Sequence, residues 1–367
     1  MNEQSEQGAK RKRRGRGRRR IRCGSNYYPV TKDLTISGRT YHVVNELGGQ
    51  RKRYQVVDPR AGPDGDMRAI HILPNVNKKR LHVFKRLAES NRNIPAIIEY
   101  HQAKGRVYLV LPWIWGTDLR RYLREVHEGK RMYPRVREVF FLFRGFAHGL
   151  TQYHHRGFVH GDLKPDNLIL CREPNRLVMI DFGSAWLVSH TMQRDPGDGI
   201  TLGKYLAPEQ VQLAEHSSEQ DGEGSGNSKK DSSQSMNKPG FVDVRCDQFS
   251  FSVMFYEMLT MELPYANLGG LVGLEENREL FKNELVPASK KSRDRNELPL
   301  RIWNKIDHVI AKGLALDPDH RYPSRTPWLR DFDDIYAELK SMSPISPVNQ
   351  AFLKVFSWAT DLFGFRT

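Results

Sequence analysis

The sequence predicts an α+β protein, with strands gathered before residue 112 and helices mainly after it. Short apolar runs at 67–73 and 107–111 have the length and composition of buried strands. Apolar residues recur at helical spacing over 135–155 and again after Asp247. With 367 residues, 38% of them hydrophobic, the chain has room for one two-lobed domain or two small domains with a sizeable core.

Positive charge is concentrated at the N-terminus. The formal net charge is +15, and residues 1–25 hold ten Lys and Arg against two Glu. This segment lacks hydrophobic periodicity, so we expect a disordered polybasic tail. Its basic run at 10–22 suits the phosphates of nucleic acid or of an anionic membrane surface, although no aromatic residues are interleaved for base stacking. A solvated tail without a partner is the alternative.

Cysteine and hydropathy patterns favour a soluble cytoplasmic protein. The three cysteines, Cys23, Cys171 and Cys246, show neither metal-binding spacing nor an even-numbered disulfide framework. No apolar stretch reaches the roughly 18 residues that a membrane span needs. The N-terminus has the charge of a signal peptide but lacks its apolar core. Nothing in the sequence indicates the oligomeric state.

Two short motifs carry the chemistry. Residues 159–167 read Val-His-Gly-Asp-Leu-Lys-Pro-Asp-Asn, and residues 181–183 read Asp-Phe-Gly. Phosphoryl transfer needs a carboxylate facing the acceptor hydroxyl, a cation near the transferring phosphate and two oxygen ligands for Mg²⁺. These groups are supplied, in that order, by Asp162, Lys164, Asn167 and Asp181. The apolar runs on either side of residues 171–176 predict a short β-hairpin that brings Asn167 and Asp181 together.

The two motifs closely resemble the catalytic loop and the metal-binding turn of the eukaryotic-type Ser/Thr protein kinases, which occur in bacteria and eukaryotes. The resemblance runs from about residue 41 to about residue 339. It implies a bilobal fold, with a small antiparallel-β N-lobe carrying one helix and a larger, mainly α-helical C-lobe. It also implies ATP and Mg²⁺, a protein substrate, Asp162 and Lys164 as catalytic residues, and Asn167 and Asp181 as metal ligands.

The resemblance divides the chain into four parts. We expect the N-lobe over 26–111 and the C-lobe over 112–340, between the polybasic tail and an amphipathic C-terminal tail at 341–367. A Ser/Gly-rich stretch at 215–240 predicts a flexible insertion in the C-lobe. The apolar positions of the C-terminal tail predict a helix that packs on the C-lobe or serves as an interfacial or partner-binding helix.

The N-lobe departs from the family at the nucleotide site. His71 stands in the third strand where the family has a lysine, and a neutral imidazole cannot make an equivalent phosphate contact. The following helix, expected at 77–90, offers Lys85 or Leu87 near the position of the family's glutamate, while Glu89 fits less well in register. The resemblance assigns contacts with ATP to Leu47, Gly48, Lys52, Ala69, His71, Leu111, Pro112 and Ile114. We expect Lys52 or a flanking arginine to replace the missing lysine, as in the with-no-lysine kinases.

The C-lobe keeps the structural positions of the family. The resemblance implies that His160 packs behind Phe182 of the Asp-Phe-Gly turn, where Gly183 follows, and that Asp247 binds the backbone of the catalytic loop. It also implies an ion pair between Glu209 and Arg321. Gly161 replaces a common arginine, so control by activation-loop phosphorylation is not expected. Leu202 replaces a threonine, which puts the preference for Ser and Thr hydroxyls in doubt.

Three functions follow from these patterns. The first is an active ATP-dependent Ser/Thr protein kinase with a relocated cation. The second is a pseudokinase that serves as a scaffold or regulatory module, supported by His71 and the missing glutamate. The third is polyanion binding through the basic tail.

Overall fold

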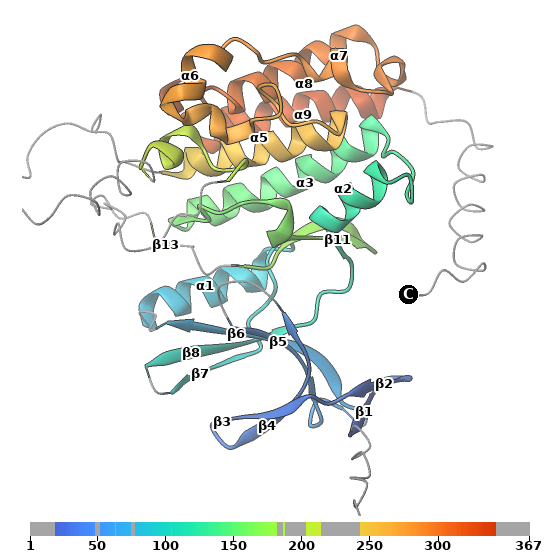
Figure 1. Ribbon diagram of the computed structural model, residues 1–367, viewed down its shortest axis with the longest axis vertical. Coiled ribbons are helices and arrows are strands. Elements are labelled where there is room, and N and C mark those ends of the chain that lie inside the picture. The colour runs from blue at the N-terminus through green and yellow to red at the C-terminus, as the bar shows by residue number, and fades with distance from the viewer. Residues whose placement is uncertain are drawn as a thin grey trace, which may run out of the picture. The chain divides into compact units, whose positions relative to one another are not determined.

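The computed structural model of the chain describes residues 19–47, 52–62, 64–74, 78–103, 105–181, 186–187, 203–213 and 243–342 (Figure 1). These residues form two compact units. One comprises residues up to Lys85 together with Ala96–Trp113, and the other comprises Arg86–Pro95 and the chain from Ile114 onward. The first is built on a sheet and the second mainly on helices, so the α+β class predicted from the sequence is confirmed.

The N-terminal unit is organised around a six-stranded antiparallel sheet with the strand order β3-β4-β5-β6-β8-β7. The strands are β3 (Lys32–Ile36), β4 (Arg39–Leu47), β5 (Arg53–Asp58), β6 (Asp66–Pro74), β7 (Glu99–Ala103) and β8 (Arg106–Pro112). Helix α1 (Lys78–Ser90) follows β6, where the sequence predicted a helix at 77–90. Side chains alternate along each strand, so one face of the sheet buries Tyr54, Val56, Ile70 and Val110 in a single apolar cluster.

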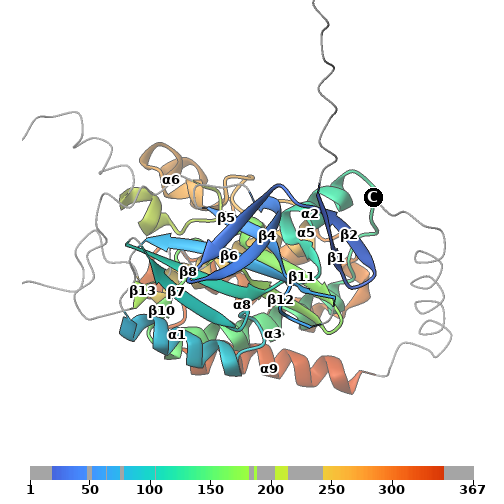
Figure 2. The same ribbon diagram turned by 90° about the horizontal axis from the view of Figure 1, so that it is seen from below.

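A β-hairpin precedes the sheet, where the sequence predicted disorder. Strand β1 (Arg20–Cys23) pairs with β2 (Asn26–Pro29), with Gly24 in the turn at a φ of +57° (Figure 2). Ile21, Cys23 and Tyr28 pack against a cluster that includes Val57. The expectation of disorder is therefore wrong for residues 20–25, because apolar residues alternate there with exposed arginines. Residues 1–18 lie outside the described part.

Long helices make up most of the C-terminal unit. Figure 1 shows α3 (Val136–His155), α5 (Val244–Thr260), α8 (Leu300–Gly313) and α9 (Arg325–Ser341) packed side by side. Smaller helices are α2 (Leu119–His127), α6 (Glu275–Phe281) and α7 (Ala288–Lys291). The core is aromatic: Phe143 stacks on Phe255 with ring centroids 4.9 Å apart, and Trp328 meets Phe251 edge-on at 5.1 Å.

Helix α5 is buried from Cys246 to its end and begins earlier than the sequence suggested. Asp243 caps it by accepting a hydrogen bond from the Arg245 N–H at 2.7 Å, so Asp247 lies in the first turn and does not open the helix. The helix ends at Met261, whose φ is +59°.

Short strands position the loops of this unit. Strands β11 (Leu168–Arg172) and β12 (Asn175–Met179) form the predicted hairpin, and β9 (Thr117–Asp118) pairs with β11. Strand β10 (Phe158–Val159) pairs with β13 (Trp186–Leu187). Asn93 donates to the Leu177 carbonyl at 2.6 Å, and Asn91 to the Gly149 carbonyl at 2.7 Å. These bonds explain why Arg86–Pro95 clusters with the helical unit.

The predicted insertion at 215–240, the C-terminal tail from 343, and Gly48, Phe182, Gly183 and Leu202 lie outside the described residues. Within the described part of the chain, no helix has the length and apolar character needed to cross a membrane.

Candidate active site

The predicted catalytic loop, residues 160–167, connects β10 to β11. Its last residues form the short 3₁₀ helix η1 (Pro165–Asn167), and the Asn167 N–H donates to the Lys164 carbonyl at 2.9 Å. The Lys164 ammonium lies 3.0 and 2.9 Å from the two oxygens of Asp162, and the Asn167 amide donates to the same carboxylate at 3.2 Å. The loop thus holds a partly exposed carboxylate between an ammonium and an amide.

Asp181 approaches the same loop from the hairpin. It follows β12, and the preceding Ile180 N–H donates to the Asn167 carbonyl at 3.0 Å. The Asn167 side-chain oxygen and the Asp181 carboxylate are hard oxygen donors of the kind that Mg²⁺ prefers. Because Mg²⁺ usually takes only one or two protein oxygens besides water and phosphate, this pair fits the ion. No cluster of three or more His, Cys, Asp or Glu side chains suited to a metal occurs among the described residues.

Asp247 fixes the backbone at the start of the loop. The His160 and Gly161 N–H groups each donate to its carboxylate at 2.8 Å, and His154 Nε2 lies 2.9 Å from it. Burial alone would raise the pKa of Asp247, but these hydrogen bonds and the nearby histidines lower it. Gly161 has a φ of +69°, a conformation that favours glycine. The predicted contact of Asp247 with the loop is present. His160 is fully buried, but its expected packing against Phe182 stays a prediction because Phe182 lies outside the described residues.

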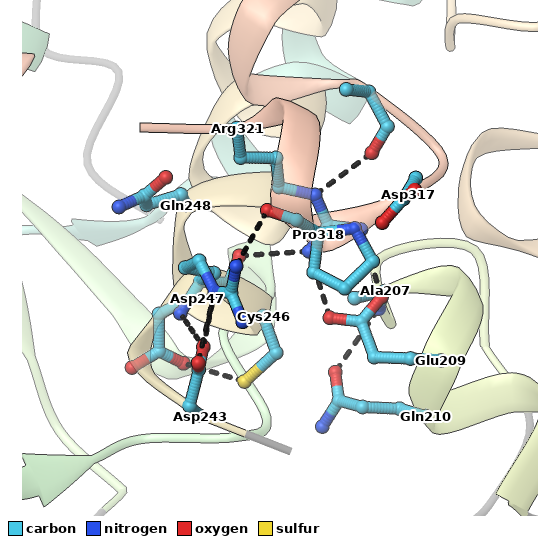
Figure 3. Close-up of polar contacts among 12 residues, drawn as sticks. Ala207, Glu209, Gln210, Asp243, Cys246, Asp247, Gln248, Asp317, Pro318 and Arg321 are labelled. Atoms are coloured by element: carbon cyan, nitrogen blue, oxygen red, sulfur yellow. Dashed lines mark hydrogen bonds and ion pairs between the residues drawn. The ribbon is translucent and has the colours of Figure 1, made fainter. Parts of the chain in front are cut away.

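The segment at 203–210 is held by side-chain contacts of Gln210 and Glu209. Gln210 accepts a hydrogen bond from the Ala207 N–H at 3.0 Å and donates to the Gly161 carbonyl at 2.8 Å, which links this loop to the catalytic loop. Arg321 forms a bidentate ion pair with Glu209 at 2.7 and 2.8 Å, as predicted (Figure 3). Its guanidinium also donates to the carbonyls of Ala315 and Arg245.

A chain of polar contacts beside Asp162 was not predicted. Arg120 donates to Asp166 at 3.2 and 3.3 Å and to the Tyr205 hydroxyl at 2.9 Å. Tyr205 in turn donates to Glu257 at 2.7 Å. Although partial burial lowers the pKa of Arg120, its contacts with Tyr205 and Asp166 raise it overall. Arg120, Asp166 and Tyr205 border an open pocket of about 510 Å³ that is also lined by Asp162, Lys164 and Lys204.

The predicted nucleotide residues of the N-terminal unit lie largely on one face of its sheet. Leu47 pairs with Arg53, Arg53 with His71, and His71 with Leu109 across four neighbouring strands. Directly opposed residues share a face, so these side chains form a row on the face opposite the apolar cluster.

The other predicted nucleotide residues have separate positions. Ala69 pairs with Leu111 on the same face as His71. Pro112 ends β8 opposite Arg68, whereas Ile114 belongs to the other unit. Lys52 precedes β5 and its side chain is exposed.

The glutamate expected in this family on helix α1 has no substitute in the described side chains of that helix. Leu87 is buried, Lys85 is half-buried, and Glu89, the sole acidic residue of α1, is exposed.

Comparison with known proteins agrees with this fold and loop. Residues 74–223 match the family model of the protein kinase domain. A probable serine/threonine-protein kinase of Streptomyces coelicolor is 26% identical over 296 residues, covering 76% of this chain and 37% of the relative. The serine/threonine-protein kinase Pkn1 of Myxococcus xanthus is 27% identical over 238 residues, covering 64% of this chain and 28% of the relative. The chain therefore spans about a third of the length of these curated relatives.

Among solved structures, the kinase domain of PknI from Mycobacterium tuberculosis matches with a TM-score of 0.49 and 19% identity, covering 82% of this chain and 98% of that domain.

The part of the chain that matches the protein kinase domain, residues 74–223, includes the loop at 160–167 and the hairpin that follows it. The two relatives described above are named serine/threonine-protein kinases, one of them as a probable one.

Proposed function

We propose that this chain transfers the γ-phosphate of ATP to Ser or Thr hydroxyls of proteins. The observation that carries the proposal is the Asp162 carboxylate held between Lys164 and Asn167. Asp162 orients the acceptor hydroxyl and takes its proton, while Lys164 offsets the negative charge of the transferring group. Asn167 and Asp181 supply oxygen ligands for Mg²⁺, which neutralises charge on the phosphates. Nothing in this division of roles requires the arginine that Gly161 replaces.

The register of the sheet points to Arg53 as the relocated cation. Arg53 lies directly opposite His71 in the β5–β6 pair, so its side chain leaves the same face as the position of the missing lysine. It is half-buried, whereas Lys52 is exposed. A guanidinium is always charged and binds phosphate oxygens through paired donors, which suits this role. Of the two described candidates, Arg53 therefore fits better, and Arg51 lies outside the described residues.

Exchange of this residue tests the assignment. Arg53→Ala should raise the KM for ATP by about 10- to 100-fold, because a charge-assisted hydrogen bond contributes roughly 1.5–3 kcal/mol. Lys52→Ala serves as the matched control and should change it little. The double variant Arg53→Ala/His71→Lys should recover much of the lost affinity. An unchanged KM in both single variants would refute the relocation.

Transfer itself is tested with labelled Mg²⁺-ATP and a generic protein substrate. Asp162→Asn keeps the shape of the side chain but removes the base, so turnover should fall by about 10²–10⁴-fold. Asp334→Asn, an exposed aspartate on α9, is the matched control. Absence of transfer by the unmodified protein, with nucleotide still bound, would instead favour the pseudokinase alternative.

A further inference from the structure

The pocket beside Asp162 has an unbalanced charge. Its lining includes three cations, Arg120, Lys164 and Lys204, and two carboxylates, Asp162 and Asp166. Lys164 pairs with Asp162 at 2.9 Å, and Arg120 pairs with Asp166 at 3.2 Å. Lys204 is exposed and has no carboxylate at ion-pair distance among the described residues. Among the described residues, the lining of the pocket therefore carries one more positive than negative charge, and Lys204 is the cation in it without a direct ion pair.

The acidic groups at this site are already occupied by the chain's own arginine. Arg120 contacts Asp166 directly and reaches the buried Glu257 through the Tyr205 hydroxyl. Its guanidinium also lies over the Tyr205 ring, 5.0 Å from the centroid. An arginine or lysine of a substrate would have to displace Arg120 to reach Asp166. A basic residue of the substrate therefore gains little binding free energy at this site.

The backbone that carries Lys204 is fixed. The Gly270 N–H donates to the Lys204 carbonyl at 2.7 Å. A Cβ atom at Gly269 would lie 2.2 Å from the same oxygen, so the two segments are in close contact. The backbone position of Lys204 is thus set by the fold of the helical unit, and its long side chain can move the ammonium within reach of that position.

From these contacts we infer that the substrate segment carries an acidic side chain, Asp or Glu, near its acceptor hydroxyl. Lys204 binds that carboxylate, and Arg120 disfavours basic residues at the same place. The inference rests on the proposed phosphotransfer to proteins and specifies its substrate class.

The test uses matched peptides with one Ser acceptor and a single Glu, Gln or Lys placed at each flanking position in turn. Peptide binding is measured by fluorescence anisotropy, and phosphate transfer is measured in parallel. At the responsive position Glu should improve binding over Gln by about three- to tenfold, and this advantage should shrink at high salt. Lys204→Glu should reverse the order of Glu and Lys peptides. Arg120→Ala should increase the affinity for the Lys peptide.

A control variant and a folding test accompany these measurements. Lys340→Glu, an exposed lysine on α9 that does not line the pocket, should leave the Glu preference intact. Thermal unfolding of each variant confirms that it folds. Equal binding of Glu, Gln and Lys peptides, absence of binding, or a preference that survives Lys204→Glu would overturn the inference. A Glu preference in binding without transfer would support the inference while refuting the proposed activity.

Discussion

Glu257 places an ionisable carboxylate within the buried helix α5. Its side chain is 7% exposed and accepts a hydrogen bond from Tyr205 at 2.7 Å. Burial raises its pKa above the ordinary value of 4.5, although Tyr205 and the charges of Arg120, His127 and Lys204 act in the opposite direction. When folding raises the pKa of an acid, the contribution of that acid to stability is fully present at pH values below the pKa of the unfolded state. This contribution is lost as the pH rises through the folded pKa.

Removal of this charge should therefore stabilise the protein at neutral pH. Glu257→Gln keeps an oxygen that accepts from Tyr205 but cannot ionise. We expect a gain on the order of 1 kcal/mol in the free energy of unfolding at neutral pH, and a much smaller difference below pH 4.5. Urea denaturation of the variant and the unmodified protein, at neutral pH and below pH 4.5, measures this difference in stability. An equal loss of stability at both values would contradict the assignment of the cost to ionisation.

Residues of the site were predictable where a short motif or a family position identifies them. The closely spaced Asp162, Lys164 and Asn167 do converge, and Glu209 and Arg321, far apart in sequence, form the expected pair. The network of Arg120 was not predictable, because its partners come from separate segments. Arg120 and Asp166 are 46 positions apart, and Arg120 and Tyr205 are 85 positions apart. Only tertiary structure brings such groups into contact.

At the scale of elements, the 3₁₀ helix η2 (Gly269–Gly273) sets the path of the 203–207 loop. A Cβ atom at Gly270 would lie 1.7 Å from the Leu206 carbonyl oxygen, so no larger residue fits without movement of backbone. The glycines of η2 therefore allow two segments to approach within van der Waals contact.

Gly270→Ala should force the 203–207 loop to shift. We expect the free energy of unfolding to fall by about 1–3 kcal/mol, as for other overpacked sites. The substitution should also weaken the binding of peptide more than the binding of ATP. Gly145→Ala is the matched control, because a Cβ there meets nothing within 4 Å in the middle of α3. That variant should gain up to about 1 kcal/mol from helix propensity. Equal effects of the two substitutions on thermal stability would refute the role of the close contact.

Elements with a strong apolar periodicity could be predicted from the sequence, whereas an element rich in charged residues was missed. The helix at Val136–His155 has a wide apolar face, and its expected bounds differ from the observed ones by a single residue. The hairpin β1–β2 was missed because Arg20, Arg22 and the tail-like composition before them masked the alternation of Ile21 and Cys23. Asp243 was overlooked as a helix cap because the apolar pattern of α5 begins after it.

For the molecule as a whole, the sequence predicted the α+β class because strand-like and helical patterns occupy different parts of the chain. The charge of the chain is the feature that the fold does not account for. The net charge is +15, and residues 1–18 contribute seven Lys and Arg against two Glu. Binding of this tail to polyanions stays a prediction, and the fold refines where the tail should be cut. Arg19 pairs with Asp33 and β1 begins at Arg20, so a deletion should end at residue 18.

Deletion of residues 1–18 should abolish binding to a DNA or RNA oligonucleotide. In the full chain the logarithm of the affinity should fall linearly with the logarithm of the salt concentration, with a slope of about −0.7 to −0.9 per neutralised phosphate. Filter binding over a series of salt concentrations measures the loss of binding and the salt dependence of the affinity. A variant with the basic residues of 10–18 replaced by Ser separates charge from length. Retained affinity after the deletion would assign the binding to the folded units.

The hairpin at the start of the sheet also has a practical use. Cys171 and Cys246 are buried, whereas Cys23 at the end of β1 is only partly buried. Burial raises the pKa of all three thiols, most strongly at Cys246. A maleimide fluorophore or a nitroxide should therefore attach to the native chain mainly at Cys23. The protein thus carries its own labelling handle, through which the N-terminal unit can be followed spectroscopically without an engineered cysteine.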